Sequence, residues 1–331
     1  MMQFFYTLGC VKIMSIGVLS MSKELIKKIK KYDSIVIFGH LNPDGDCYGS
    51  EVGLKEAIKA TFPKKNVYAV GSGFKPGVDL YGELDKVDDE IISKSLCIGV
   101  DFNTISRSED SRLTNGLDLC MIDHHIKSEP FGSVQIIDND AIACCEIITN
   151  IIIKEKLKLT TLGASALYLG IVTDSGRFQY NPKPRAFELA AYLLNYGVDM
   201  KQLYDRLYES DEISLKFKGY VYSHFKKTKN GVIYCVLPHS VLSKYNMSGH
   251  KGAVFVNLLA GVKDCPIWVF FGEDEDGKTF VEYRSNKFNV QPIATMYGGG
   301  GHRFAAGCNV PSLEMHKEIL KKLDNLIIEG K

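Results

Sequence analysis

The feature that most constrains the fold is a regular alternation of short apolar runs with amphipathic stretches, which begins near Lys23. The apolar runs predict buried strands and the amphipathic stretches predict helices, an alternation typical of βαβ units with a parallel sheet. The predicted strands are Ser34–Phe38, Val67–Val70, Ser95–Val100 and Leu117–Ile122, and the predicted helices are Glu51–Thr61, Cys144–Ile153, Pro184–Tyr196, Met200–Glu209 and Ile213–Lys227. The run Leu167–Val172 fits a strand or a buried helix, since periodicity does not separate the two. We therefore predict an α/β fold with an N-terminal parallel sheet.

Beyond residue 227 the pattern changes to hairpins and shorter helices. The predicted strands there are Val232–Leu237, Ile267–Phe271 and Thr279–Tyr283, and the predicted helices are Gly252–Val262, Val290–Tyr297 and Ser312–Ile328. Asp276-Gly277 lies between the last two strands, and this dipeptide favours a tight hairpin turn. With 331 residues the chain is long enough for two domains. We predict an N-terminal extension at residues 1–21, a first domain at 22–200, a helical linker at 201–227 and a smaller mixed α/β domain at 228–331.

Charge and cysteine usage exclude several classes of protein. The 40 Lys and Arg residues balance 39 Asp and Glu residues, so the chain lacks the basic surplus with which proteins coat nucleic acids. Nine cysteines without a Cys-x-x-Cys pair indicate reduced, buried thiols rather than a zinc site or a disulfide framework. The apolar segment Met1–Ser20 is interrupted by Lys12 and has no basic start, so neither a membrane span nor a secretory signal is expected. We expect a cytoplasmic protein without membrane contact.

Four apolar runs each end at a side chain that can bind metal ions. These side chains are His40, Asp101, the triplet Asp123–His125 and Asp174. In an open parallel sheet, residues just past the carboxyl ends of the strands meet in one crevice, where ligands bind. A single acid at a strand end means little, but four such ends with Asp or His predict one shared metal site.

The loop after the first predicted strand adds two carboxylates. It contains His40, Asp44 and Asp46, with Pro43 and Gly45 between them. An extended backbone would direct the side chains of Asp44 and Asp46 to the same side of the chain. The alternative is an Asp-rich turn that caps a helix, which explains Pro-Asp-Gly by itself. That alternative does not explain His40, so we predict that both aspartates bind metal.

Carboxylates and imidazoles make up the predicted ligand set, which is His40, Asp44, Asp46, Asp101, His124 and Asp174. Such a set suits Mn²⁺, Fe²⁺, Co²⁺ or Mg²⁺ better than an ion that prefers thiolates. It is large enough for two ions that share a bridging carboxylate. Two ions about 3.5–4 Å apart stabilise the attacking and leaving oxygens of a displacement at phosphorus. The ligand set therefore predicts phosphoester hydrolysis.

A second cluster lies near the C-terminus, where Gly298–Gly301 precede His302. Glycines let the backbone approach a ligand closely and offer N–H groups to an anion, although a flexible loop or a helix end would use the same residues. Arg284 and Ser285 lie at the end of a predicted strand, where Arg284 could hold a phosphate through paired hydrogen bonds or could simply be solvated. This region is therefore a candidate anion site.

Five motifs in order resemble the DHH phosphoesterase superfamily. They are His40-x-x-Pro43-Asp44-Gly45-Asp46-x-x-Gly49-Ser50, Val100-Asp101, Asp123-His124-His125, Thr173-Asp174-Ser175-Gly176, and Gly298–His302 with Ala305-Ala306-Gly307. The last motif resembles the DHH-associated C-terminal domain of the first subfamily. The motifs extend over roughly residues 23–330, and their arrangement is similar to the branch of nano-RNA exonucleases and pAp phosphatases.

This resemblance implies that the first domain is catalytic and binds two divalent ions, expected to be Mn²⁺. His40 and Asp44 would bind one ion, and Asp101 would bridge the two. Asp46, His124 and Asp174 would bind the other ion. His125 would face the scissile phosphate, and Asp123 would orient a ligand.

The resemblance also implies a substrate class. The substrate would be a short oligoribonucleotide or adenosine 3′,5′-bisphosphate (pAp), hydrolysed to mononucleotides, and a homodimer is possible. The far end of the substrate would be held by Arg284, Ser285, Gly299, Gly300, Gly301 and His302. Two other functions stay open: a phosphodiesterase for linear or cyclic dinucleotides, and an idle nucleotide-binding regulator, against which the complete ligand set argues. Asn42 and Cys47-Tyr48 depart from the family pattern and leave the substrate preference open.

Overall fold

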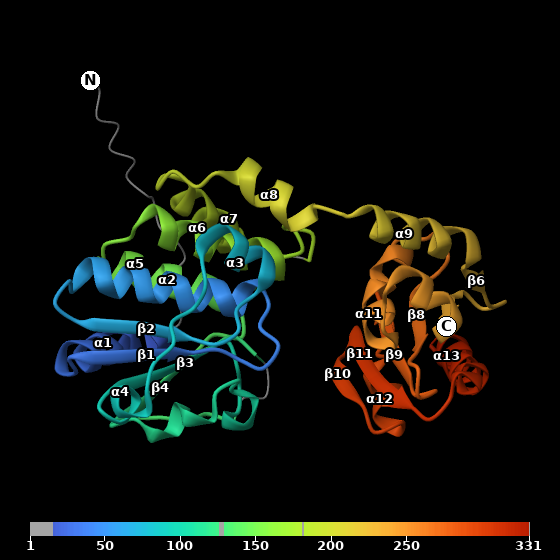
Figure 1. Ribbon diagram of the computed structural model, residues 1–331, viewed down its shortest axis with the longest axis horizontal. Coiled ribbons are helices and arrows are strands. Elements are labelled where there is room, and N and C mark those ends of the chain that lie inside the picture. The colour runs from blue at the N-terminus through green and yellow to red at the C-terminus, as the bar shows by residue number, and fades with distance from the viewer. Residues whose placement is uncertain (1–15, 126–128, 181, 331) are drawn as a thin grey trace. The chain divides into compact units, whose positions relative to one another are not determined.

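The computed structural model describes residues 16–125, 129–180 and 182–330. The chain divides into two compact units between Tyr208 and Glu209 (Figure 1). Of the predicted helical linker, α8 (Met200–Tyr208) belongs to the first unit and α9 (Glu212–His224) to the second. Residues 1–15 of the predicted N-terminal extension lie outside the described residues, and α1 begins at Ile16.

The first unit is built on a five-stranded sheet with the order β2-β1-β3-β4-β5. The strands are β1 (Ser34–Phe38), β2 (Asn66–Val70), β3 (Leu96–Val100), β4 (Asp118–Asp123) and β5 (Val134–Ile137). Every neighbouring pair is parallel, which confirms the predicted parallel sheet. β5 was not predicted, because only part of this four-residue strand is buried.

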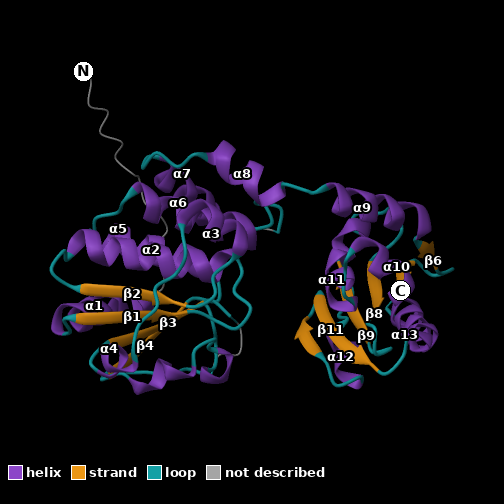
Figure 2. Cartoon of the chain, viewed as in Figure 1, coloured by secondary structure: helices purple, strands orange, loops and turns teal. Residues whose placement is uncertain are grey.

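Helices cover both faces of this sheet. On one face α1 (Ile16–Lys31), α2 (Gly45–Thr61) and α5 (Cys144–Lys154) share a core with the strands, and α6 (Thr161–Asp174) packs on α2 and α5 (Figure 2). Helices α3 (Lys75–Tyr81), α7 (Pro184–Leu194) and α8 lie on that side as well. The opposite face is covered by α4 (Asp89–Ser93) and by the 3₁₀ turn Ser111–Asn115, whereas the 3₁₀ turn Ile105–Arg107 has no buried residue. The carboxyl edge of the sheet stays available for a site.

The structure decides one open alternative in this unit and corrects one prediction. The run Leu167–Val172 is the buried helix of the two alternatives and belongs to α6, whose buried residues show no helical periodicity of polarity. Helix α2 begins at Gly45 rather than at Glu51, because the Asp44 carboxylate caps it by accepting hydrogen bonds from the N–H groups of Asp46 and Cys47, both at 3.0 Å. The predicted extended backbone from Asp44 to Asp46 was therefore wrong.

The second unit holds a six-stranded sheet with the order β10-β11-β9-β8-β7-β6. The strands are β6 (Lys226–Lys227), β7 (Val232–Leu237), β8 (Ile267–Glu273), β9 (Thr279–Ser285), β10 (Gly300–His302) and β11 (Ala305–Val310). β8 and β9 form the predicted antiparallel hairpin, with Gly277 in the left-handed region at φ +81°. β7 forms an antiparallel hairpin with the short strand β6, and it pairs in parallel with β8. A helical crossover connects β7 and β8, as parallel pairing requires.

Helices again cover both faces of the second sheet. One face packs against α9, α10 (His239–Leu242), α11 (Gly249–Val254) and a 3₁₀ turn at Phe255–Leu259. The predicted continuous helix Gly252–Val262 is thus divided between α11 and that turn. The other face packs against α12 (Gln291–Met296) and α13 (His316–Glu329). Among the described residues, no helix combines the length and apolar character needed to cross a bilayer.

Candidate metal centre

The carboxyl edge of the first sheet brings the predicted ligands together. His40 lies just after β1, Asp101 just after β3, and His124 just after β4. Asp46 lies in the first turn of α2, and Asp174 is the last residue of α6. The loop after β1 is held by strand-like pairing of His40 with Ser108 and by the hydrogen bond from Leu41 N–H to the Arg107 carbonyl at 2.8 Å. Ends of strands and of helices therefore both supply the site.

Asp101 lies at the centre of the site with one carboxylate oxygen toward each of two histidines. Its Oδ2 is 3.5 Å from Nε2 of His40, and its Oδ1 is 3.3 Å from Nε2 of His124. The residue is 2% exposed, and Oδ1 has no hydrogen-bond partner in the described residues. Asp101 also adopts a left-handed backbone with φ +66°, which is strained for a residue with a side chain. A shared carboxylate between two cations would account for both features.

A cluster of one imidazole and two carboxylates lies on the His124 side of Asp101. Nε2 of His124 is 3.8 Å from Oδ2 of Asp46 and 3.6 Å from Oδ2 of Asp174. The Nδ1 of His124 is 3.3 Å from the carbonyl of Ala141, so an Nδ1–H donated there leaves Nε2 free to bind a cation. Asp174 is at the negative end of the α6 dipole, where a cation is favoured.

The carboxylate of Asp46 is held by the N-terminus of α5. Its two oxygens accept hydrogen bonds from the backbone N–H groups of Cys144 at 2.5 Å and Cys145 at 2.9 Å. We did not predict this contact. The signal was present, because a helix was expected to begin at Cys144 and helix N-termini attract anions.

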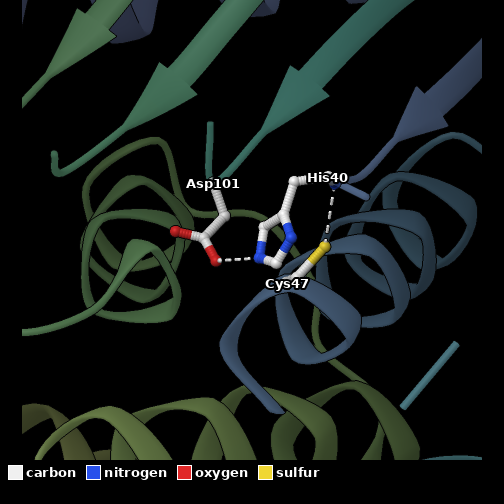
Figure 3. Close-up of side chains that lie close together, drawn as sticks. All are labelled: His40, Cys47 and Asp101. Carbon is white, nitrogen blue, oxygen red and sulfur yellow. Dashed lines mark hydrogen bonds and ion pairs between the residues drawn. The ribbon is translucent and has the colours of Figure 1, made fainter. Parts of the chain in front are cut away.

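The His40 side of Asp101 has a different composition, since it includes Cys47 (Figure 3). Ligand atoms of His40, Cys47 and Asp101 all lie within 4.8 Å of one another. Asp44 is at the edge of this cluster, with its Oδ1 3.9 Å from Nε2 of His40, and the same oxygen caps α2. No cysteine was included in the predicted ligand set, and the structure places Cys47 beside it. The sequence signal was weak, because Cys47 reaches the site only when α2 begins at Gly45.

His125 and Asp123 form a pair beside the centre. Nδ1 of His125 is 2.7 Å from Oδ1 of Asp123 and 3.8 Å from Oδ1 of Asp101. Asp123 is fully buried at the end of β4. The carboxylate therefore fixes the orientation of the His125 ring and leaves its Nε2 on the other side.

A loop after β5 supports the two histidines, and sequence reasoning missed it. The side-chain amide of Asn139 donates to the carbonyl of His124 at 3.3 Å and to that of His125 at 2.5 Å. The neighbouring Asp138 forms an ion pair with Arg185 at 2.9 Å, and Arg185 also pairs with buried Glu146. The loop is therefore tied to α5 and α7, and no pattern in the sequence indicates it.

The electrostatics of the site favour bound cations. Burial and the charge of Asp101 raise the pKa of Asp46 to about 8, and burial and the charge of Asp46 raise the pKa of Asp174. Burial opposes the charged form of His124, but the nearby carboxylate of Asp101 outweighs this effect and raises the pKa of His124. Burial also opposes ionisation of Asp101, yet the imidazoles of His124 and His40 beside it lower its pKa. Several carboxylates share one buried space, and divalent cations fit this excess of negative charge.

In the predicted anion site of the second unit, the polar side chains already have partners within the protein. Arg284 forms an ion pair with Glu282 at 2.8 Å and donates to the Tyr283 carbonyl at 2.8 Å. The hydroxyl of Ser285 donates to the Pro266 carbonyl at 2.9 Å and accepts from backbone N–H groups that follow it. Ser285 therefore shapes the end of β9.

The glycine run forms the edge of the second sheet. Gly300, Gly301 and His302 make up β10, which pairs with β11, and β11 pairs with β9 at Ala305 and Arg284. Gly299 is required by the fold itself, because a Cβ there would lie 2.1 Å from the Gly307 carbonyl oxygen. A cavity of about 440 Å³ beside this edge is lined by His250, Phe280, Val281, Glu282, Tyr297, Gly298, Gly299, Gly307, Cys308 and Asn309.

Comparison with known proteins identifies both units. Residues 34–171 match the N-terminal domain of the DHH family, and residues 229–329 match the DHHA1 domain. The chain is 32% identical to a bifunctional oligoribonuclease and PAP phosphatase of Bacillus subtilis, over 93% of this chain and 99% of that protein. It is 36% identical to a Mycoplasma genitalium protein of the same description, over 90% of this chain and 95% of that protein.

A solved structure agrees on the fold. The crystal structure of an exopolyphosphatase-related protein from Bacteroides fragilis has a TM-score of 0.85 at 24% identity, covering 95% of this chain and 99% of that one. Enzymes of the DHH family depend on divalent metal ions, in agreement with the donor clusters described above. The chain therefore belongs to the DHH family, as a phosphoesterase with an N-terminal DHH domain and a C-terminal DHHA1 domain.

Proposed function

We propose that this phosphoesterase uses two divalent ions, with Mn²⁺ as the expected metal, to hydrolyse short oligoribonucleotides and pAp to mononucleotides. The observation that carries the proposal is the position of Asp101, whose two oxygens face different histidines at 3.5 and 3.3 Å. The substrate class is supported by the two relatives described as oligoribonuclease and PAP phosphatase, each matched over at least 90% of this chain.

The proposed ligands divide into two groups around Asp101. His40 and Asp44 would hold one ion, and Asp46, His124 and Asp174 would hold the other. When bound, two such ions supply Lewis-acid stabilisation of the phosphoryl oxygens and a water with a lowered pKa. The backbone N–H groups at the start of α5 hold the Asp46 carboxylate in place, and the loop after β5 does the same for the His124 backbone.

His125 is proposed to contact the scissile phosphate. Its Nδ1 lies 2.7 Å from Oδ1 of Asp123, which orients the ring, and its Nε2 would donate to a phosphate oxygen. In this role Asp123 fixes the orientation of the His125 ring toward the substrate.

The DHHA1 domain is proposed to hold the far end of the nucleotide. Arg284, Gly300, Gly301 and His302 would contact it, with the cavity beside Gly299 as the place for its base or sugar. Ser285 and Gly299 would act by shaping the strand ends, since their local contacts already occupy them. A cytoplasmic location and a homodimer are part of this proposal, and gel filtration tests the latter.

A substrate panel tests the proposal directly. We expect Mn²⁺-dependent hydrolysis of pAp and of di- to pentaribonucleotides, with little activity on long RNA or pyrophosphate, and complete loss with excess chelator. Mn²⁺ should restore more activity than Zn²⁺ after chelation. Full activity in chelator would refute the two-metal centre. Preference for linear or cyclic dinucleotides without pAp hydrolysis would instead support a dinucleotide phosphodiesterase.

A further inference from the structure

Cys47 lies at the metal centre with its sulfur close to two of the proposed ligands. The sulfur and ligand atoms of His40 and Asp101 lie within 4.8 Å of one another, and Figure 3 shows the three side chains meeting from different elements. Cys47, His40 and Asp101 are 0%, 6% and 2% exposed. The sulfur accepts a hydrogen bond from the backbone N–H of His40 at 3.2 Å, so it already acts as an electron-pair donor there.

The backbone holds Cys47 firmly at this position. Its N–H donates to the capping carboxylate of Asp44 at 3.0 Å, and it occupies the first turn of α2, which is packed between the sheet and α6. The cap uses Oδ1 of Asp44, the same oxygen that lies 3.9 Å from Nε2 of His40. Cys47 supplies a sulfur atom where a purely oxygen and nitrogen set was expected.

Two other buried thiols near the centre serve as a contrast. The sulfur of Cys144 lies 3.4 Å from the Ile122 carbonyl, and that of Cys145 lies 3.5 Å from the Asp46 carbonyl. Among the described residues, Cys47 is the cysteine that joins a cluster of possible cation ligands. The sulfur is thus placed selectively on the His40 side of Asp101.

We propose that Cys47 is a direct ligand of the ion held by His40 and Asp101, and that this position prefers borderline and soft divalent cations, such as Zn²⁺, Co²⁺ and Cd²⁺, over Mn²⁺ and Mg²⁺. This inference rests on the proposed metal centre and deepens it. Thiolate sulfur is a soft donor, whereas the Asp46, His124 and Asp174 side offers oxygen and nitrogen. On coordination the S–H bond breaks, an S–metal bond forms, and the proton passes to solvent without any change of oxidation state. The two positions therefore differ in metal preference.

Cobalt titration of the chelated full-length protein tests this assignment. Wild type should develop a near-ultraviolet thiolate-to-cobalt charge-transfer band, which Cys47→Ser should lose while its visible cobalt bands show that the other position still fills. Cys97→Ser is the matched control, because Cys97 is also buried but lies in β3 outside the clusters. Loss of a residue that supports a metal ligand typically lowers metal affinity by roughly 10- to 100-fold, and loss of the ligand itself should cost at least as much. The Zn²⁺ affinity of Cys47→Ser should fall accordingly, whereas its Mn²⁺ affinity should change little.

Two results would overturn the inference while leaving the metal centre intact. One is cobalt binding to wild type without a charge-transfer band, and the other is an equal band in Cys47→Ser. Failure of wild type to bind any cobalt, zinc or manganese would refute both the centre and the inference. If Cys47→Ser does not fold, X-ray absorption of zinc-loaded wild type decides, with a sulfur neighbour expected at about 2.3 Å and its absence counting against Cys47.

Discussion

The metal centre of the first unit and the glycine-rich edge of the second differ in how their polar groups are satisfied. At the metal centre, carboxylates of Asp46, Asp101 and Asp174 are buried or half-buried near one another, and a buried oxygen of Asp101 lacks a hydrogen bond. At the edge, Arg284 is neutralised by Glu282, and the hydroxyl of Ser285 is fully used by backbone. Bound cations would satisfy the first arrangement, whereas internal partners already satisfy the second, which would have to exchange one of them for a ligand.

Asp101→Asn should have the largest effect, and it tests whether the metal centre depends on the charge of this carboxylate. The change keeps the shape but removes the charge shared by both cation positions, so the fold should persist while metal content drops. Activity should fall by roughly 100-fold or more, since metal catalysis supplies several kcal/mol. Metal analysis and kcat with Mn²⁺ on pAp measure the effect. Asp88→Asn, an exposed aspartate without a capping hydrogen bond, is the control. Near wild-type rates would show that Asp101 does not bridge two ions.

Arg284→Ala tests the other side of the comparison. The metals should stay bound, and a small generic diester such as bis-(p-nitrophenyl) phosphate should still be cleaved. Hydrolysis of a diribonucleotide or pAp should weaken by roughly 10- to 150-fold in kcat/KM, because a charge-assisted phosphate contact contributes about 1.5–3 kcal/mol.

Glu282→Gln is the matched variant, since it removes the internal partner and keeps the guanidinium. It should bind nucleotide at least as tightly as wild type. Equal losses on both substrates in Arg284→Ala would mean that Arg284 supports the metal centre or the fold, and no loss on either would remove it from the substrate site.

Asn139→Ala sharpens the comparison by weakening the support of the metal centre without touching a ligand. Its amide holds the carbonyls of His124 and His125, so the Mn²⁺ dissociation constant should rise by roughly 10- to 100-fold. Isothermal titration measures it. Lys183→Ala removes only the surface ion pair with Asp140 in the same loop and should leave Mn²⁺ binding unchanged. Equal effects of both variants would point to a general loosening of the loop.

The smallest expected effect is a change in the stability of the chelated protein with pH. In chelator, the raised pKa values of Asp46, His40 and His124 mean that these groups hold more protons in the folded than in the unfolded protein. The stability from those protons is complete below the unfolded pKa values of about 4 for Asp and about 6.5 for His, and it is lost as pH rises through the folded values. Because the pKa of Asp101 is lowered, its contribution to stability changes only below about pH 4 and does not oppose this trend.

We therefore expect Tm of the chelated protein to fall by a few degrees as pH rises from about 5 to about 8. Saturating Mn²⁺ should reduce or reverse the fall, since metal binding requires the deprotonated ligands. Asp46→Asn should flatten the profile in chelator. A Tm that rises with pH in chelator would contradict the electrostatics described for the site.

Much of the fold could be predicted because its signals are local. The strands β1 to β4 are short apolar runs with polar residues at their ends, and their carboxyl ends share one edge in any parallel sheet. That rule alone places His40, Asp101 and His124 together, as the structure shows. By contrast, the start of α2 depended on whether Asp44 points to a metal or to the backbone, and both choices are compatible with the same residues.

The sequence by itself determined the two-unit α/β architecture and most of the residue types at the metal centre, because strand periodicity and acids at strand ends are properties of the chain. Only the tertiary structure decided that α6 is a helix, that β7 pairs in parallel with β8, and that Cys47 reaches His40. The physical reason is common to all three. A fully buried helix has no polar face to mark its period, strand pairing depends on what lies between the strands, and a side-chain contact across elements depends on where a helix begins.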